Sequence, residues 1–192
     1  MKVNKSITNQ SIRAFDGCWP SLSERVYVDI MACVIGKVVI SDDVSIWPGV
    51  VVRGDVNDIN IGARSNIQDN ATLHCTHDGI YSPGGFALQI GNDVTVGHAA
   101  VLHGCTIGNL VLIGMGSIVL DGAVIEDTCL IGAGAVVSPG THIPAGQLWV
   151  GNPARYKRDL KPEEHEMLSY SAAYYKKLKD AYLLTDSNAA KQ

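Results

Sequence analysis

A period of six dominates the hydrophobic pattern of this chain. Eighteen aliphatic residues follow it, with three breaks: Val28, Val34, Ile40, Ile46, Val52, Ile61, Ile67, Leu73, Ile90, Val96, Leu102, Ile107, Ile113, Val119, Ile125, Ile131, Val137 and Ile143. The fourth residue after each is mostly small or β-branched, including Val56 and Thr106, and we expect it to point inward too. The helical period of 3.6 does not explain this spacing, which fits a short strand and a turn repeated on each side of a prism. The pattern predicts an all-β solenoid with three hexads per triangular coil, six coils in all, stacked about 4.8 Å apart.

The breaks in the period predict where the coils are interrupted. The interval from Val52 to Ile61 is three residues too long, and the interval from Leu102 to Ile107 is one residue too short, as in a tightened corner. The interval after Leu73 is eleven residues too long and contains a Pro-Gly-Gly sequence at 83–85. We therefore predict a protruding loop within residues 77–89.

The pattern changes after Ile143. Residues 151–155 are turn-rich, and Pro162 can begin a helix. One predicted helical face carries Met167, Leu168, Ser171, Tyr175, Leu178 and Tyr182. We predict an N-terminal segment over residues 1–27, the β-helix over 28–148, a turn and C-terminal α-helix over 149–184, and a disordered tail over 185–192.

The charge, the apolar runs and the cysteines of the chain indicate its cellular location and the kinds of partner to expect. The formal charge is −4 without a basic run, so we expect no nucleic-acid partner. The N-terminus lacks the apolar stretch of a signal peptide, and no run of about 18 apolar residues predicts a membrane span. The five cysteines form no CxxC pair, which favours free thiols in a reducing cytoplasm.

Three histidines fall at related places in the hexad register. Arg53, His74 and His103 follow aliphatic residues on one side of the prism in successive coils, so they form one outward column. Two imidazoles at that spacing can bind one metal ion. His98 lies on a different side, one coil above Gln68. A neighbouring chain could bring His98 to the histidine pair, and this geometry predicts a cyclic homotrimer with a metal site between subunits.

The motifs around these residues resemble γ-class carbonic anhydrases and their homologues. The resemblance runs from about residue 12 to 180 and rests on these ordered motifs: Arg53-Gly54-Asp55, Ser65-Asn66-Ile67-Gln68-Asp69, Leu73-His74, Gly97-His98 and His103-Gly104-Cys105. It implies a left-handed parallel β-helix of hexapeptide repeats.

The resemblance also implies the chemistry. His74, His98 and His103 would bind Zn²⁺, with Fe²⁺ as the other metal, across a trimer interface. A metal-bound hydroxide would hydrate CO2 reversibly to bicarbonate. Asn66 and Gln68 would organise water and substrate, and Arg53 and Asp55 would form a salt bridge between subunits.

Three features depart from the best-studied active members. Val56 stands where they have an acidic residue, the loop at 77–86 is poor in carboxylates, and Tyr174 stands where close relatives often have Asn. His77 and Tyr81 are the candidates for a proton shuttle.

Two alternatives to a carbonic anhydrase stay open. A hexapeptide-repeat acyltransferase or thioesterase would use one histidine and a groove for coenzyme A. A catalytically silent trimer would retain the metal site and act as a scaffold or an assembly subunit.

Overall fold

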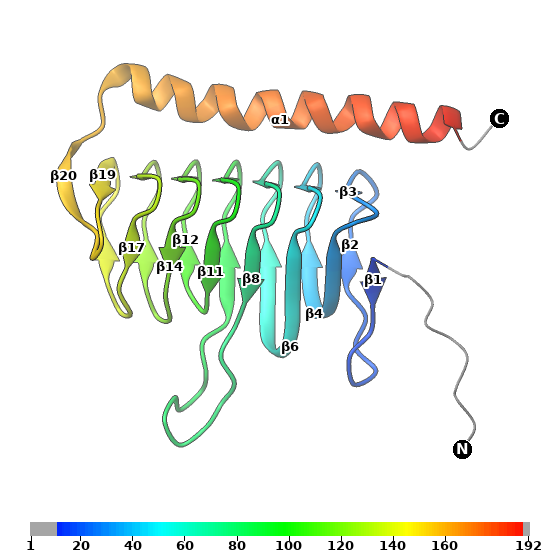
Figure 1. Ribbon diagram of the computed structural model, residues 1–192, viewed down its shortest axis with the longest axis horizontal. Coiled ribbons are helices and arrows are strands. Elements are labelled where there is room, and N and C mark those ends of the chain that lie inside the picture. Colours follow the sequence, from blue (N-terminus) through cyan, green and yellow to red (C-terminus); the bar gives the residue numbers. More distant parts are fainter. Residues whose placement is uncertain (1–10, 190–192) are drawn as a thin grey trace.

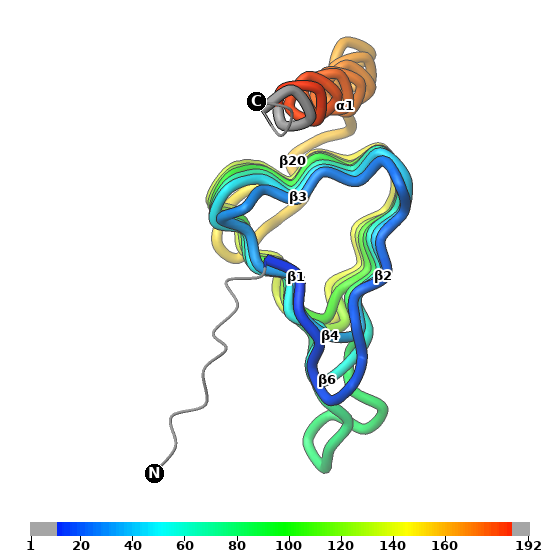
Figure 2. The backbone as a smooth tube through the Cα atoms, turned by 90° about the vertical axis from the view of Figure 1, so that its right-hand side faces the viewer, coloured from blue at the N-terminus to red at the C-terminus, as the bar shows by residue number. Residues whose placement is uncertain are grey.

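The chain forms a triangular solenoid. The computed structural model describes residues 11–189. Viewed from its N-terminal end, the chain turns anticlockwise as it recedes, through β1 (Ile12–Arg13), β2 (Ser21–Leu22) and β3 (Tyr27–Val28) (Figure 2). An anticlockwise path that moves away from the viewer is left-handed. The left-handed parallel β-helix implied by the resemblance is therefore confirmed.

Each side of the prism is a ladder of parallel strands. Side 1 consists of β1, the first part of β4 (Cys33–Ile40), the first part of β6 (Val51–Ile61), β8 (Thr72–His74), β11 (Val101–His103), β14 (Ile118–Val119) and β17 (Val136–Val137). Side 2 consists of β2, the second parts of β4 and β6, β9 (Leu88–Ile90), β12 (Thr106–Ile107), β15 (Val124–Ile125) and β18 (His142–Ile143). Side 3 consists of β3, β5 (Ser45–Ile46), β7 (Asn66–Ile67), β10 (Thr95–Val96), β13 (Leu112–Ile113), β16 (Leu130–Ile131) and β19 (Gln147–Val150), with β20 (Arg155–Asp159) antiparallel at its end.

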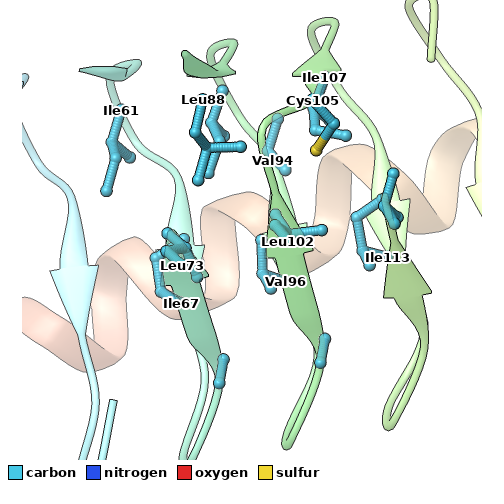
Figure 3. Close-up of a cluster of buried hydrophobic side chains, with 14 of the residues drawn as sticks. Ile61, Ile67, Leu73, Leu88, Val94, Val96, Leu102, Cys105, Ile107 and Ile113 are labelled. Atoms are coloured by element: carbon cyan, nitrogen blue, oxygen red, sulfur yellow. The ribbon is translucent and has the colours of Figure 1, made fainter. Parts of the chain in front are cut away.

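The aliphatic residues of the hexads fill the interior of the prism. All of them are buried except Val28, which is partly buried and packs against the same cluster. Figure 3 shows a section of this core, with Leu73 and Leu102 on neighbouring coils. Stacking thus removes a continuous aliphatic column from water, at about 25 cal/mol per Å² of apolar surface.

Two predictions for the second inward position are wrong. Val56 is 42% exposed and Thr106 is also exposed, while Ile59 and Cys105 are buried in their places. Alternation along a strand puts the inward residue two positions before the next aliphatic residue. Counting four residues forward fails wherever the corner between them is lengthened or shortened.

The solenoid begins and ends outside the predicted range of 28–148. Strands β1 and β2 already pair with β4, and β19 extends the stack past Gln147. Leu22 lies six residues before Val28 and Trp149 lies six residues after Ile143, so the period of six extends past both ends of the predicted range. Helix α1 (Pro162–Ala189) continues past Leu184 into the predicted tail. Residues 1–10 and 190–192 lie outside the described residues.

Helix α1 lies along side 3 (Figure 1). Leu168 and Ala172 are buried in this contact, whereas Met167, predicted for the same face, is 40% exposed. The largest unpredicted member is Lys179, which is fully buried and donates from Nζ to Asp43 Oδ1 at 3.1 Å and to the Arg25 carbonyl at 3.1 Å. A hydrophobic pattern cannot predict a buried charge. Over residues 11–189, no helix combines the length and apolarity needed to cross a membrane.

The long insertion forms the protruding loop visible in Figure 1. Its two ends are joined by backbone hydrogen bonds between Thr76 and Phe86, at 2.9 and 3.0 Å. The Asn57 side chain also donates to the Thr76 carbonyl at 3.0 Å. The base of the loop is therefore fixed to the solenoid beside β8.

Candidate metal centre

The outward column predicted for side 1 is present. His103 pairs with His74 in the register between β11 and β8, one residue after the inward pair Leu102 and Leu73. Strand β6 pairs with β8 through Val52 and Leu73, which puts Arg53 at the next outward position. Parallel strands in register thus bring residues far apart in the sequence to one patch of side 1.

The two imidazole rings of this column face each other. His74 Nδ1 lies 3.0 Å from His103 Nε2. The opposite nitrogens face carboxylates: His74 Nε2 lies 3.0 Å from Asp55 Oδ1, and His103 Nδ1 lies 2.7 Å from Asp121 Oδ1. An ionised carboxylate can only accept, so these ring nitrogens donate to it.

The protonation of His74 and Asp55 suits this arrangement. Burial lowers the pKa of His74 below its ordinary value, against the effect of its hydrogen bond to Asp55, so its ring is neutral near pH 7. Burial raises the pKa of Asp55, but hydrogen bonds from Arg53 and His74 lower it below its ordinary value overall. Arg53 Nη1 donates to Asp55 Oδ2 at 2.6 Å within the same chain.

These residues fit a metal ion. With both N–H groups directed to carboxylates, two bare nitrogen lone pairs face each other at 3.0 Å, an arrangement that a cation between them would stabilise. Two ligands of a tetrahedral zinc, at about 2.0–2.1 Å each, lie about 3.3 Å apart. Carboxylates behind ligating histidines are also the usual arrangement in metal sites.

The other predicted site residues lie around the outer surface of side 3. Asn66 and Gln68 are buried there. Asn66 Nδ2 donates to Thr95 Oγ1 at 2.9 Å, and Thr95 Oγ1 lies 3.0 Å from Ser171 Oγ of helix α1. The helix therefore anchors this polar group.

A groove of about 420 Å³ lies beside them, lined by Gln68, His98 and Tyr175 among others. Gln68 Nε2 donates to Asn66 Oδ1 at 3.2 Å, so its Oε1 is the atom left to accept a further hydrogen bond. His98 is exposed, and its Nδ1 lies 2.9 Å from Asp69 Oδ2. Its Nε2 is the nitrogen left for a ligand.

A single chain does not assemble the whole predicted site. Arg53, Asp55, His74 and His103 come together on side 1, while Asn66, Gln68 and His98 come together at side 3. Within residues 11–189, no group of three or more His, Cys, Asp or Glu side chains could hold a metal ion.

Comparison with known proteins identifies the family. No protein-family model matches the chain. The chain is 54% identical to protein YrdA of Escherichia coli over 172 residues, which is 90% of this chain and 94% of YrdA. It is 45% identical over 159 residues to a Methanocaldococcus jannaschii protein named "Probable carbonic anhydrase", covering 83% of this chain and 96% of that one. A solved hexapeptide transferase family protein from Anaplasma phagocytophilum is 38% identical, with a TM-score of 0.82 over 89% of this chain and 97% of that one.

The chain belongs to the family of YrdA and γ-carbonic-anhydrase-like hexapeptide-repeat proteins. Members of this family are typically metal-dependent and trimeric.

Sequence reasoning missed several residues of this site. Asp69, which stands in a quoted motif but was given no role, lies two residues after Ile67 and one coil below His98, and Asp121 lies two residues after Val119. Both carboxylates therefore stand one position after the one that His74 and His103 occupy in their hexads, and a comparison of that next position predicts both. Ser171 was placed on the buried helical face, but its contact with Thr95 had no sequence signal because a helix can dock in many registers.

The two thiols next to the histidine column, those of Cys75 and Cys105, are poor candidates for direct chemistry. Burial raises the pKa of Cys75 and raises that of Cys105 to about 12, so both thiols stay protonated. His77 and Tyr81, the predicted proton shuttles, are exposed on the insertion loop, and Tyr81 is 92% exposed.

Proposed function

We propose that this protein catalyses the reversible hydration of CO2 to bicarbonate at metal sites shared by neighbouring chains of a homotrimer. Each site takes His74 and His103 from one chain and His98 from the next. The observation that carries this proposal is the facing pair of imidazole nitrogens, 3.0 Å apart, with a carboxylate behind each ring. When bound to three neutral imidazoles, zinc lowers the pKa of a coordinated water to about 7, which supplies the nucleophile that CO2 hydration needs.

The surface of side 1 supports the trimer. The outward residues of its strands form a partly exposed, mainly apolar stripe: Val51, Thr72, Val101, Ile118 and Val136. The matching stripe on side 2 is more polar: Asn60, Gln89, Thr106, Val124 and His142. Side 3 is already covered by helix α1. Side 1, which carries His74 and His103, is therefore the side best suited to contact another chain.

The buried polar residues next to His98 have roles in this proposal. Asn66 fixes the Gln68 amide, so that the free Gln68 Oε1 can orient a water or hydroxyl group at the mouth of the groove. Arg53 holds Asp55, and Asp55 orients the His74 ring. The resemblance implies a salt bridge between Arg53 and Asp55 of neighbouring subunits, whereas in the single chain Arg53 pairs with its own Asp55. All five cysteines are free, which suits the cytoplasmic location that we propose.

Stopped-flow measurement of CO2 hydration tests the proposal, using anaerobically purified protein of known metal content. We expect about one metal ion per chain and measurable hydration. Gln68→Ala should keep its metal and lose at least about 10-fold in kcat, since Gln68 orients the reacting group without binding the metal. Gln89→Ala is the matched control, because Gln89 is an outward glutamine on side 2.

The other outcomes separate the alternative functions. Metal binding through all three histidines without hydration would favour a silent scaffold. If the protein binds coenzyme A, and if replacing His98 does not change its metal content, an acyltransferase or thioesterase is favoured. Either result would overturn the carbonic anhydrase proposal.

A further inference from the structure

His103 has a carboxylate partner that the resemblance did not assign. Its Nδ1 lies 2.7 Å from Asp121 Oδ1, and Thr76 Oγ1 donates to Asp121 Oδ2 at 2.9 Å. The His103 and Asp121 side chains are both only about one-third exposed, at 31% and 30%. Thr76 thus holds Asp121 through Oδ2, while Oδ1 accepts a hydrogen bond from the His103 imidazole.

We propose that Asp121, held by Thr76, is a positioning residue that keeps His103 protonated at Nδ1 and presents Nε2 to the metal. This inference rests on the proposed function, because it assigns His103 a metal to bind. The Nε2 atom of His103 is the nitrogen that faces His74 Nδ1 at 3.0 Å. A flip of the ring or a change of tautomer would direct an N–H group at the metal position and remove a ligand.

The backbone around Asp121 is built for this close approach. Gly104 follows His103 with φ of +52°, and a Cβ at this position would collide with Asp121 Oδ1. The same Cβ would lie 2.7 Å from Phe86 Cβ. A glycine at position 104 therefore leaves room both for Asp121 and for the returning end of the insertion loop.

The insertion loop contributes to this arrangement through its base. Thr76 and Phe86 pair through two backbone hydrogen bonds, so the position of the Thr76 hydroxyl depends on the loop closing correctly. Phe86 also lies over Gly122, where a Cβ would meet its ring at 3.1 Å. The base of the loop thus places Thr76 and encloses Asp121.

The two side-1 carboxylates differ in their own partners. The charge of Asp55 is balanced by Arg53, whose Nη1 lies 2.6 Å from it. The hydrogen-bond partner behind Asp121 is the neutral hydroxyl of Thr76. Asp121 is therefore held for His103 by a neutral donor, whereas Asp55 is held for His74 by a cation.

The test compares Asp121→Ala, Asp121→Asn and Thr76→Val with the wild type. The control is Glu126→Gln, because Glu126 also contacts a histidine, His142, at 2.8 Å, but on the exposed surface of side 2. The first measurement is a ¹⁵N NMR spectrum of the histidine side chains in metal-free protein, with the His103 signals assigned through His103→Asn. We expect the Nδ1–H tautomer in wild type and a mixture of tautomers in Asp121→Ala.

The second measurement is zinc affinity by competition with a chromophoric chelator. We expect Asp121→Ala to weaken binding by about 10–100-fold, and the other two variants to weaken it less. The amide oxygen of Asp121→Asn can still accept from Nδ1, so this variant should also preserve the fold. Glu126→Gln should bind zinc like wild type.

The two proposals fail differently. If Asp121→Ala and Asp121→Asn keep both the wild-type tautomer and the wild-type zinc affinity, Asp121 does not position His103. If wild type itself binds no zinc at the three histidines, the proposed function fails, and the NMR spectrum alone decides whether Asp121 orients the ring.

Discussion

Side 1 and side 3 of the prism have the same ladder of parallel strands but differ in their outward residues. On side 3, Ser45, Asn66 and Thr95 are buried beneath helix α1, and Asn66 and Thr95 hydrogen-bond to each other. On side 1 the outward stripe from Val51 to Val136 is mainly apolar, and no helix of the described chain covers it. Buried polar groups need specific partners, which the chain supplies from its own helix. An apolar stripe needs only a complementary dry surface, which a second chain can supply.

The largest expected effect comes from adding a charge to side 1. Ile118→Glu puts a carboxylate into the proposed interface, where burial without a partner costs several kcal/mol. We expect the trimer to dissociate to monomers at micromolar concentration and its bound metal to be lost. Sedimentation velocity and metal analysis measure both effects.

Val124→Glu is the matched control for Ile118→Glu. Val124 is an outward aliphatic residue on the neighbouring strand β15 of side 2 and is 38% exposed. This variant should stay trimeric and keep its metal. A trimeric, metal-bound Ile118→Glu would refute side 1 as the interface.

The contact between helix α1 and side 3 depends strongly on Lys179. Lys179→Ala removes the contact of 3.1 Å between helix α1 and buried Asp43, although Arg25 still contacts Asp43 at 3.1 Å and Lys176 Nζ lies 4.0 Å from it. Breaking a buried ion pair costs about 3–5 kcal/mol, so we expect a loss of about 3 kcal/mol in the free energy of unfolding. Urea denaturation at one fixed protein concentration measures this change.

Lys176→Ala gives the comparison for this contact. Lys176 lies three residues earlier, is partly exposed, makes an i,i+4 pair with Asp180 at 3.1 Å and lies 4.0 Å from Asp43 Oδ1. Such exposed pairs contribute about 0.3–0.5 kcal/mol. Equal losses in the two variants would show that burial of Lys179 does not stabilise the helix contact.

A smaller effect should appear as acid sensitivity of the same contact. A hydrogen bond from Arg25 lowers the pKa of Asp43, burial opposes this, and Lys179 lowers the pKa further. The folded-state pKa is below the ordinary value of 3.8, so the stability that Asp43 contributes is present above that value. It is lost as pH falls through the lower folded-state pKa. The difference in unfolding free energy between wild type and Asp43→Asn should therefore shrink below about pH 4. A difference that stays constant from pH 7 to pH 3 would contradict this role.

Most of the solenoid was predictable because its interior repeats. Each side of every coil must bury an aliphatic residue at the same place, so the period of six can be recognised in the sequence itself. The prediction failed at Val56 and Thr106, where an inserted or missing residue at a corner changes the count. Lys179 was unpredictable for a different reason, since its burial depends on where helix α1 docks against Asp43.

The site was predictable in part for the same reason. His74 and His103 occupy one register position in neighbouring coils, so arithmetic alone put them together. Asp121 was missed because it is the second residue after its aliphatic neighbour, whereas His74 and His103 are each the first. Its carboxylate reaches His103 from a turn of the next coil. The proposed contact between chains has no direct signal in the sequence of one chain, where the separation of His98 from the other two histidines is the feature that points to it.

Mixed trimers test the shared site most directly. A His74→Asn trimer and a His98→Asn trimer should each lack complete three-histidine sites. Co-expression of the two variants in equal amounts should form mixed trimers, in which roughly one interface in four joins an intact His74 side to an intact His98 side, as the geometry of a closed ring requires. We expect bound metal to recover toward a quarter of the wild-type content. If verified mixed trimers recover no metal while both single variants have lost it, the site does not take its ligands from two chains.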